Sequence, residues 1–313
     1  MKSKSRVYLS IIALLMVFAV GCWGTTDFKA ERKRVSEVEV KAFQNQKKQK
    51  KMDIYIPIKE QYATSRHAQS LKTLQKSNHV EPTCYKCMST EYNLAPANNK
   101  PVPKDIKLSI SCAVCHVLTV AEFKLRLDPL ETCTSCHNND GPEGKEIVPG
   151  LVVHHPQKEM FLGYGAIGVP KTPDSKFKSG LTCIECHMPN EAHTFQGKTP
   201  AEALKEHTES ICVMCHADQS EEQFAKEVAR MQSKIKNGCD EMEKGLRVSQ
   251  EKIAQSKRKG VNVTQAEQVY NIVYANLSFV IADSSLGIHN FEYTTKIMDY
   301  NKLRKKQLDG MLP

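Results

Sequence analysis

The sequence predicts a mainly α-helical protein with much irregular structure, in which a region rich in paired cysteines precedes long C-terminal helices. Three observations predict this fold class. The 313 residues include 12 cysteines but only one tryptophan and 7% aromatic residues, which is little material for two large side-chain cores. Proline and glycine interrupt the middle of the chain throughout. Apolar residues recur at helical spacing only in the last third.

The N-terminus has the pattern of a lipoprotein signal peptide. Three cations among the first six residues precede an apolar run over residues 7–20, and small residues lead into Cys22. The alternative, a retained transmembrane helix, needs roughly 20 apolar residues. We therefore expect residues 1–21 to be a signal peptide and Cys22 to carry a lipid. The protein is then exported and lipid-anchored to a membrane, either periplasmic or at the cell surface.

The composition divides the mature chain into three parts. Residues 22–51 are polar and charged, which predicts a tether. Residues 52–216 hold every C-x-x-C pair, with turn formers between them, so helices there are expected to be short and sheet nearly absent. Residues 217–313 are expected to form a helical C-terminal region.

The C-terminal region predicts three helices. The first carries an apolar stripe made of Phe224, Val228, Met231, Ile235, Cys239, Met242 and Leu246. Gly260 marks a break, and Thr264 with Glu267 predicts a capping box that opens the second helix. A third helix is expected from about Phe291 to Leu308. Because Cys239 lies on the apolar stripe, we expect it to be buried rather than reactive.

Ten of the twelve cysteines form five C-x-x-C pairs, and histidine directly follows four of the pairs. The five pairs are Cys84/Cys87, Cys112/Cys115, Cys133/Cys136, Cys183/Cys186 and Cys212/Cys215, and the four histidines are His116, His137, His187 and His216. Two thiols on one turn of helix can form thioethers to the two vinyl groups of one porphyrin, and the next imidazole then becomes the proximal iron ligand. Zinc is the alternative for C-x-x-C pairs, but a zinc site does not need histidine directly after the second cysteine. The pattern therefore predicts a multihaem cytochrome c core with four haems, each attached through a C-x-x-C-H motif.

The first pair departs from this pattern, since Met88 follows Cys87 where histidine is expected. The pair shares the spacing of the others, so we expect a fifth haem c, ligated by the Met88 thioether or by a residue from elsewhere. A thioether ligand would raise the potential of this haem above that of haems with two histidine ligands. A disulfide or free thiols are the alternatives.

The histidines outside the motifs and the net charge also limit the function. Seven histidines remain, namely His67, His79, His154, His155, His193, His207 and His289, and most are expected to be sixth ligands of the irons. The net charge of +9 falls to +6 without the three signal-peptide cations, and haem propionates would lower it further. We therefore expect no nucleic-acid partner.

The order and flanks of the five pairs resemble those of the pentahaem cytochrome c nitrite reductases, the ammonia-forming enzymes, over residues 67–289. In that family the first pair is followed by lysine and four C-x-x-C-H sites come after it. The resemblance extends to Met188-Pro189 after the fourth motif and to Gly287-Ile288-His289 near the C-terminus.

The resemblance implies that His67 pairs with His137, His193 with His116, and His289 with His187. It also implies that His155 is an active-site histidine above the first haem. His216 lacks the expected partner, and the candidates are His154, His207 or His155, or a five-coordinate iron.

Several residues depart from the family. Met88 replaces the lysine, Asp140 stands where the active-site tyrosine is expected, and the second catalytic cation between residues 68 and 83 is missing. Asn139 and His154 occupy positions of calcium ligands, so the sequence does not predict calcium.

These departures favour an electron carrier over an enzyme. We expect a membrane-anchored cytochrome that exchanges electrons with redox protein partners and has no nucleic-acid partner. The alternative is a divergent reductase of nitrite, hydroxylamine or a sulfur oxyanion that uses His155. A homodimer through the C-terminal helices is also expected, since the family forms dimers in this way.

Overall fold

The computed structural model describes residues 57–118, 123–139, 144–216 and 218–313. The predicted signal peptide, Cys22, the predicted tether and Asp140 lie outside these residues. The stretch Ile58–Pro313 forms one compact unit. The expected boundary after residue 216 falls inside this unit, where short helices give way to long ones.

The cysteine-rich part consists of short elements joined by irregular chain. Residues 57–64 are helical. The helices that follow are α3 (Ser70–Gln75), α4 (Thr90–Leu94), α5 (Cys112–Cys115), α6 (Pro129–Thr134), α7 (Gln157–Leu162), α8 (Ser175–Lys178), α9 (Cys183–His187), α10 (Pro200–Glu206) and α11 (Ile211–Cys215). Single turns of 3-10 helix are η2 (His67–Gln69), η3 (Pro82–Lys86), η4 (Pro103–Asp105) and η5 (Pro189–Glu191). Strands β1 (His116–Leu118) and β2 (Phe123–Leu125) pair antiparallel, with His116 opposite Leu125.

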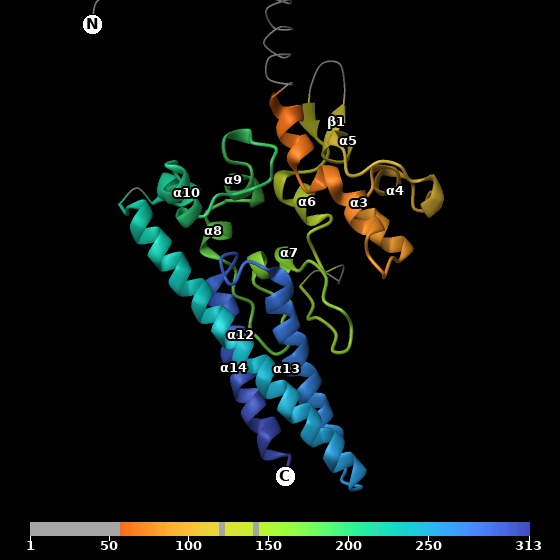
Figure 1. Ribbon diagram of the computed structural model, residues 1–313, viewed down its shortest axis with the longest axis vertical. Helices are drawn as coiled ribbons and strands as arrows, with labels where there is room; N and C mark the ends of the chain where they lie inside the picture. The colour runs from red at the N-terminus through yellow and green to blue at the C-terminus, as the bar shows by residue number, and fades with distance from the viewer. Residues whose placement is uncertain (1–56, 119–122, 140–143, 217) are drawn as a thin grey trace, which may run out of the picture. The chain divides into compact units, whose positions relative to one another are not determined.

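Three long helices follow, as the apolar periodicity predicts. They are α12 (Glu221–Arg258), α13 (Thr264–Asp283) and α14 (Phe291–Gly310). They lie side by side, and the short elements gather near the end where α12 begins and α13 ends (Figure 1). With a rise of about 1.5 Å per residue, the 38 residues of α12 extend roughly 57 Å.

The ends of the long helices follow local chemistry. Ser220 caps α12 in a capping box with Gln223. The predicted capping box at Thr264 and Glu267 is wrong, because Val263 is the N-cap residue and makes no side-chain cap. Instead, Asn262 accepts a hydrogen bond from the Thr264 N–H at 3.0 Å. An asparagine two residues earlier thus satisfies the donor that the box would have served.

The main hydrophobic core lies between the three long helices and residues 147–169. Its largest fully buried side chains include Tyr293, Phe279 and Met160. Cys239 is buried on the α12 stripe, as expected. A second cluster, in the cysteine-rich part, contains only Leu71, Leu74, Tyr85 and Ile106. The cysteine-rich part therefore has few side chains of its own with which to fill its interior.

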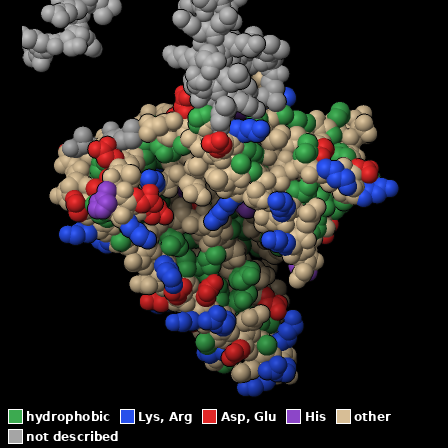
Figure 2. Space-filling model, turned by 45° about the horizontal axis from the view of Figure 1, so that its top comes forward, with side chains coloured by type: hydrophobic (Ala, Val, Ile, Leu, Met, Phe, Trp, Pro, Cys, Tyr) green, Lys and Arg blue, Asp and Glu red, His purple; other side chains and the backbone are tan. Residues whose placement is uncertain are grey.

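Hydrophobic and charged side chains both lie on the surface. On the face drawn in Figure 2, patches of hydrophobic side chains lie among charged side chains of both signs. Over the described ranges, the length and apolar character that a membrane-spanning helix requires are not combined in any one helix.

Gly163 ends α7 with a left-handed backbone, φ +68°. A Cβ at this position would lie 1.8 Å from the Thr172 carbonyl oxygen. We expect Gly163→Ala to lower the free energy of unfolding by roughly 2 kcal/mol or more, because it adds a backbone clash to the left-handed penalty of about 1 kcal/mol. Denaturant unfolding followed by circular dichroism measures this cost.

Gly180→Ala is the matched control for that variant. Gly180 has φ +81°, and a Cβ there meets nothing within 4 Å. It should carry the left-handed penalty alone. Equal losses in the two variants would contradict the packing argument at Gly163.

Candidate functional site

The cysteine pairs lie on single turns of helix. Pairs two, four and five fall within α5, α9 and α11, and pair three straddles the end of α6. Residues three apart share one face of a helix, so both thiols of a pair point to the same side. Thr182 and Glu185 form a capping box that fixes α9, with Glu185 Oε2 accepting from the Thr182 N–H at 2.6 Å. Most of the ten thiols are half-buried.

Three pairs of imidazole rings face one another across the cysteine-rich part. The ring centroids are 6.0 Å apart for His67 and His137, 6.2 Å for His116 and His193, and 6.1 Å for His187 and His289. The partners are distant in sequence and come from different elements. In each case a histidine that follows a cysteine pair is matched with one that does not. A fourth pair of this kind, His137 and His155, has its centroids 6.1 Å apart but shares His137 with the first pair.

The separation fits one iron between each two rings. A metal–imidazole bond is about 2 Å long and the ring centroid lies about 1 Å behind the nitrogen, so two axial imidazoles place their centroids about 6 Å apart. The residues present therefore fit a haem with two histidine ligands at each of the three places. When bound, such a group supplies reversible one-electron chemistry.

Burial lowers the pKa of four of the facing imidazoles, His67, His116, His137 and His187, and so favours the neutral form that a metal ligand requires. It lowers the pKa of His137 to about 4, with further lowering from the nearby His67 and His155. Burial likewise lowers the pKa of His187, and the neighbouring His289 adds to the effect. The pKa of His67 is lowered by burial alone. Neutral imidazoles present a nitrogen lone pair at neutral pH.

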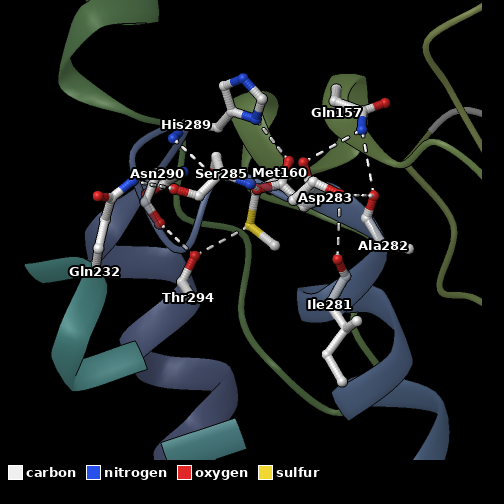
Figure 3. Close-up of polar contacts among 11 residues, drawn as sticks. Gln157, Met160, Gln232, Ile281, Ala282, Asp283, Ser285, His289, Asn290 and Thr294 are labelled. Carbon is white, nitrogen blue, oxygen red and sulfur yellow. Dashed lines mark hydrogen bonds and ion pairs between the residues drawn. The ribbon is translucent and has the colours of Figure 1, made fainter. Parts of the chain in front are cut away.

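Two of the facing histidines are oriented by a hydrogen bond from Nδ1. His193 Nδ1 lies 2.7 Å from the Glu191 carbonyl oxygen. His289 Nδ1 lies 2.6 Å from Asp283 Oδ1 (Figure 3). A proton fixed on Nδ1 leaves Nε2 as the nitrogen that can bind a metal. Both rings are thus held in the tautomer that a haem ligand needs.

Successive cysteine pairs lie next to one another. Cys133 and Cys183 share a hydrogen bond, which raises the pKa of the Cys133 thiol and lowers that of Cys183. Helices α6 and α9 pack together at this point. Cys87 Sγ lies 3.9 Å from the Cys136 carbonyl oxygen, which brings the first pair to the third.

The second and fifth pairs join the same series. Burial raises the pKa of Cys115 to about 11, and the nearby Cys136 thiol contributes. Burial also raises the pKa of Cys186, against the charge of Lys176 and with contributions from Cys212 and Cys215. The third pair therefore neighbours the first, second and fourth, and the fourth neighbours the fifth.

Met88 lies against aliphatic side chains. Together with Cys84 and Tyr92 it packs on the small cluster that contains Leu71 and Leu74. The Met88 carbonyl accepts a hydrogen bond from Ser70 Oγ at 2.9 Å. Cys84 is not in a disulfide, so the disulfide alternative for the first pair is not formed in the structure. Iron ligation by Met88 stays a prediction.

The remaining candidate ligands are not brought together with His216. His216 is exposed, and its ring lies 5.2 Å from that of Phe224. Over the described ranges, no ring contact joins His216 to His154, His155 or His207. His207 is exposed at the C-terminus of α10. The sixth ligand of the fifth haem stays open.

His155 is exposed and lies at the entrance to α7, with φ +44°. Its ring centroid is 6.1 Å from that of His137 and 5.3 Å from that of His154. It thus lies beside the third attachment site, which itself neighbours the first. Asn139 Oδ1 accepts a hydrogen bond from the His154 N–H at 2.8 Å, so these two residues contact each other.

The sequence did not single out two residues of the site. The Phe195 ring lies 4.5 Å from that of His67 and 6.0 Å from that of His193, so it contacts one histidine from each of two different pairs. Asp283, at the end of α13, holds His289. An acidic residue directly after the mostly apolar run 277–282, six positions before a candidate ligand, was the available signal for Asp283.

Comparisons with known proteins agree with this geometry. The family model for cytochrome c552 matches residues 148–307, and the model for cytochrome c554 and c-prime matches residues 34–117. The chain is similar to the outer cell wall cytochrome OcwA, with 30% sequence identity and a TM-score of 0.66 over 78% of this chain and 49% of that one. A search of curated protein sequences gave no match.

Two further solved structures share the fold. An undecahaem cytochrome from the S-layer of Carboxydothermus ferrireducens has 24% identity and a TM-score of 0.58, over 79% of this chain and 41% of that one. The cytochrome c nitrite reductase from Desulfovibrio desulfuricans has 16% identity and a TM-score of 0.55, over 77% and 69%. The chain spans about half the length of OcwA and less of the S-layer protein. The matched family model covers half of the chain, and on this ground the protein belongs to the cytochrome c552 family and carries covalently bound haem c. It shares its fold with the nitrite reductase.

Proposed function

We propose that this multihaem cytochrome carries electrons along a connected row of five haems and exchanges them with redox protein partners. One observation supports this above all others, namely the three imidazole pairs whose centroids are 6.0 to 6.2 Å apart. An iron with two histidine ligands has no open position for a substrate and keeps its ligands when it changes charge. Such sites suit electron exchange.

The residues of the chain set the path. The proposed row runs from the first attachment pair to the third, fourth and fifth, with the second joined at the third. The hydrogen bond between Cys133 and Cys183 and the approach of Cys87 to Cys136 support this order. Porphyrins attached to neighbouring thiols would lie close to one another, and an electron would then move along the row in short steps.

The site of action belongs to the proposal as well. The apolar run before Cys22 supports export and lipid anchoring. Two relatives of similar fold are described as an outer cell wall and an S-layer protein. We place this cytochrome outside the cytoplasm on a membrane surface. A second copy docking on the C-terminal helices is part of the proposal, since Val248, Tyr274 and Leu303 are exposed there.

A reductase that uses the first haem and His155 is the alternative. His155 is exposed and lies beside the third attachment site, near the first. Against it, the chain has Met88 instead of the lysine of the related reductases, and Asp140 instead of their tyrosine. Stabilising the developing charge on a reduced oxyanion requires such donors.

Two measurements on the mature protein test the proposal. Mass spectrometry should show five haems and one lipid modification, because each adds a fixed mass. Electron paramagnetic resonance of the oxidised protein should show low-spin iron at the three bis-histidine sites. A purely low-spin spectrum with no turnover of nitrite by the reduced protein supports the carrier. A high-spin iron that is oxidised by nitrite in a single turnover would replace the carrier with the reductase.

A further inference from the structure

A carboxylate is buried directly behind one histidine of the three facing pairs. Asp283 is the last residue of α13, and its side chain is 1% exposed. Its Oδ1 lies 2.6 Å from His289 Nδ1, and its Oδ2 accepts a hydrogen bond from the Ser285 hydroxyl (Figure 3). In the part of the chain that the structure describes, no lysine or arginine forms an ion pair with Asp283. The His289 ring N–H and the Ser285 hydroxyl are therefore the side-chain donors that satisfy this buried carboxylate.

The turn between α13 and α14 holds the pair in place. Ser284, Leu286 and Gly287 have left-handed backbones, with φ of 62°, 52° and 95°. Ser285 Oγ accepts a hydrogen bond from the His289 N–H at 3.1 Å. Non-glycine residues adopt this conformation at a cost of about 1 kcal/mol or more each. The chain accepts that cost here and thereby fixes the imidazole and the carboxylate relative to each other.

Side chains from two other helices donate hydrogen bonds to the backbone carbonyls of this turn. Gln157 Nε2, on α7, donates to the carbonyls of Ala282 and Asp283 at 3.3 Å. Gln232 Nε2, on α12, donates to the Ser285 carbonyl at 3.3 Å. Figure 3 shows both amides reaching the turn from opposite sides. The position of Asp283 is thus set by two helices besides its own.

In each facing pair one histidine does not follow a cysteine pair, and these three histidines differ in the hydrogen-bond partner of their Nδ1 atom. Behind His289 is a carboxylate, and behind His193 is the neutral Glu191 carbonyl. His67 Nδ1 is buried, and over the described ranges it has no hydrogen-bond partner. A hydrogen bond to a carboxylate is stronger than one to a neutral acceptor and makes the imidazole a stronger electron donor. The three sites are therefore unequal.

We infer that Asp283 lowers the reduction potential of the haem held between His187 and His289, and makes it the lowest of the three bis-histidine sites. This inference rests on the proposed ligation. A buried negative charge stabilises the more positive, oxidised state of the site, because little water is present to screen it. The step affected is the uptake of one electron from a neighbouring haem. The proton stays on His289 Nδ1, so only the electron moves.

The placement gives Asp283 a role in the path. The fourth attachment pair, Cys183/Cys186, stands between the third and the fifth. If the fourth haem has a low reduction potential, electron transfer onto it from the third or the fifth haem is the energetically unfavourable step of the path. Asp283 is a positioning residue, since it acts through His289, the one proposed iron ligand among the described residues to which it is hydrogen-bonded.

The test is Asp283→Asn in the complete holoprotein. Asparagine keeps the size and removes the charge. We expect the reduction potential of one haem in a potentiometric titration to rise. The equilibrium constant for its reduction should increase at least tenfold, which corresponds to about 59 mV for a one-electron couple. The other components should stay. Asp309→Asn, the same charge change at the far end of α14, should move none of them. Unchanged potentials in Asp283→Asn with all haems present would overturn the inference.

Two further variants separate the possible failures. Ser285→Ala removes the hydroxyl donor to Asp283 Oδ2 and leaves more charge on the oxygen that faces His289, so the same component should move downward. If mass spectrometry shows that Asp283→Asn has lost a haem, the test rests on Ser285→Ala. A reduction potential that stays unchanged or rises in Ser285→Ala then overturns the inference. His289→Ala should turn one low-spin haem high-spin. If it does not, the proposed ligation is wrong; if it does while Asp283→Asn moves nothing, only the inference about Asp283 fails.

Discussion

Alanine in place of His193 is expected to convert one haem, attached at Cys112 and Cys115, from low spin to high spin. The thioether bonds and the ligand His116 remain, so the haem stays attached while one coordination position opens. Electron paramagnetic resonance and cyanide or carbon monoxide binding measure the change. Compared with the unmodified protein, the variant should have one more iron per chain that binds cyanide or carbon monoxide. His67→Ala should produce the same change at the haem attached at Cys133 and Cys136.

His79→Ala is the control for these variants. His79 is exposed and is not one of the facing rings. Its removal should leave the spectrum unchanged. A His193→Ala protein that remains entirely low-spin and binds no added ligand would show that His193 is not the sixth ligand of this haem. The proposed electron path would then lose the geometric argument on which it rests.

Truncation of Phe279 to alanine is expected to lower the free energy of unfolding by about 3–5 kcal/mol, the usual cost of removing a fully buried phenylalanine. The ring is 0% exposed and packs against Gly165, where an added Cβ would lie 3.1 Å from the ring. The loss should be visible as a lower denaturant midpoint of the helical signal. The attachment cysteines are untouched, so the haem content should not change.

Ile281→Ala tests the same helix without the burial. Ile281 is 44% exposed on α13, and its truncation should change the free energy of unfolding by about 0.5 kcal/mol or less. If both variants lose the same amount, the core between the long helices does not stabilise this part of the chain. A Phe279→Ala protein with a normal midpoint would lead to the same conclusion.

The features that the sequence predicted are those carried by local patterns. The first long helix, α12, follows from an apolar stripe that includes Ile235 and Leu246, and both residues are buried. The scarcity of side-chain core in the cysteine-rich part follows from composition. The structure also brings together His67 with His137, although these residues come from separate elements. That pairing came from resemblance to a family, because local periodicity carries no information about distant contacts.

The features that the sequence left open depend on tertiary structure. His216 ends near Phe224 rather than near any of the three histidines considered for it. At the N-terminus of α13, Asn262 accepts the hydrogen bond from the Thr264 N–H, and the predicted box does not form. Asp283 was missed because its importance lies in the imidazole that the following turn brings back to it.

The distances in sequence between facing histidines bear on how the holoprotein is made. A chain is synthesised from its N-terminus, so the histidines become available in that order. His67 is already present when the third attachment motif emerges, and His193 follows its partner by a moderate stretch of chain. His289 comes only after α12 and α13 have been completed. Of the three porphyrins proposed to lie between facing histidines, the fourth would thus be the last to acquire its second ligand, and a chain truncated within α13 would leave that iron without it.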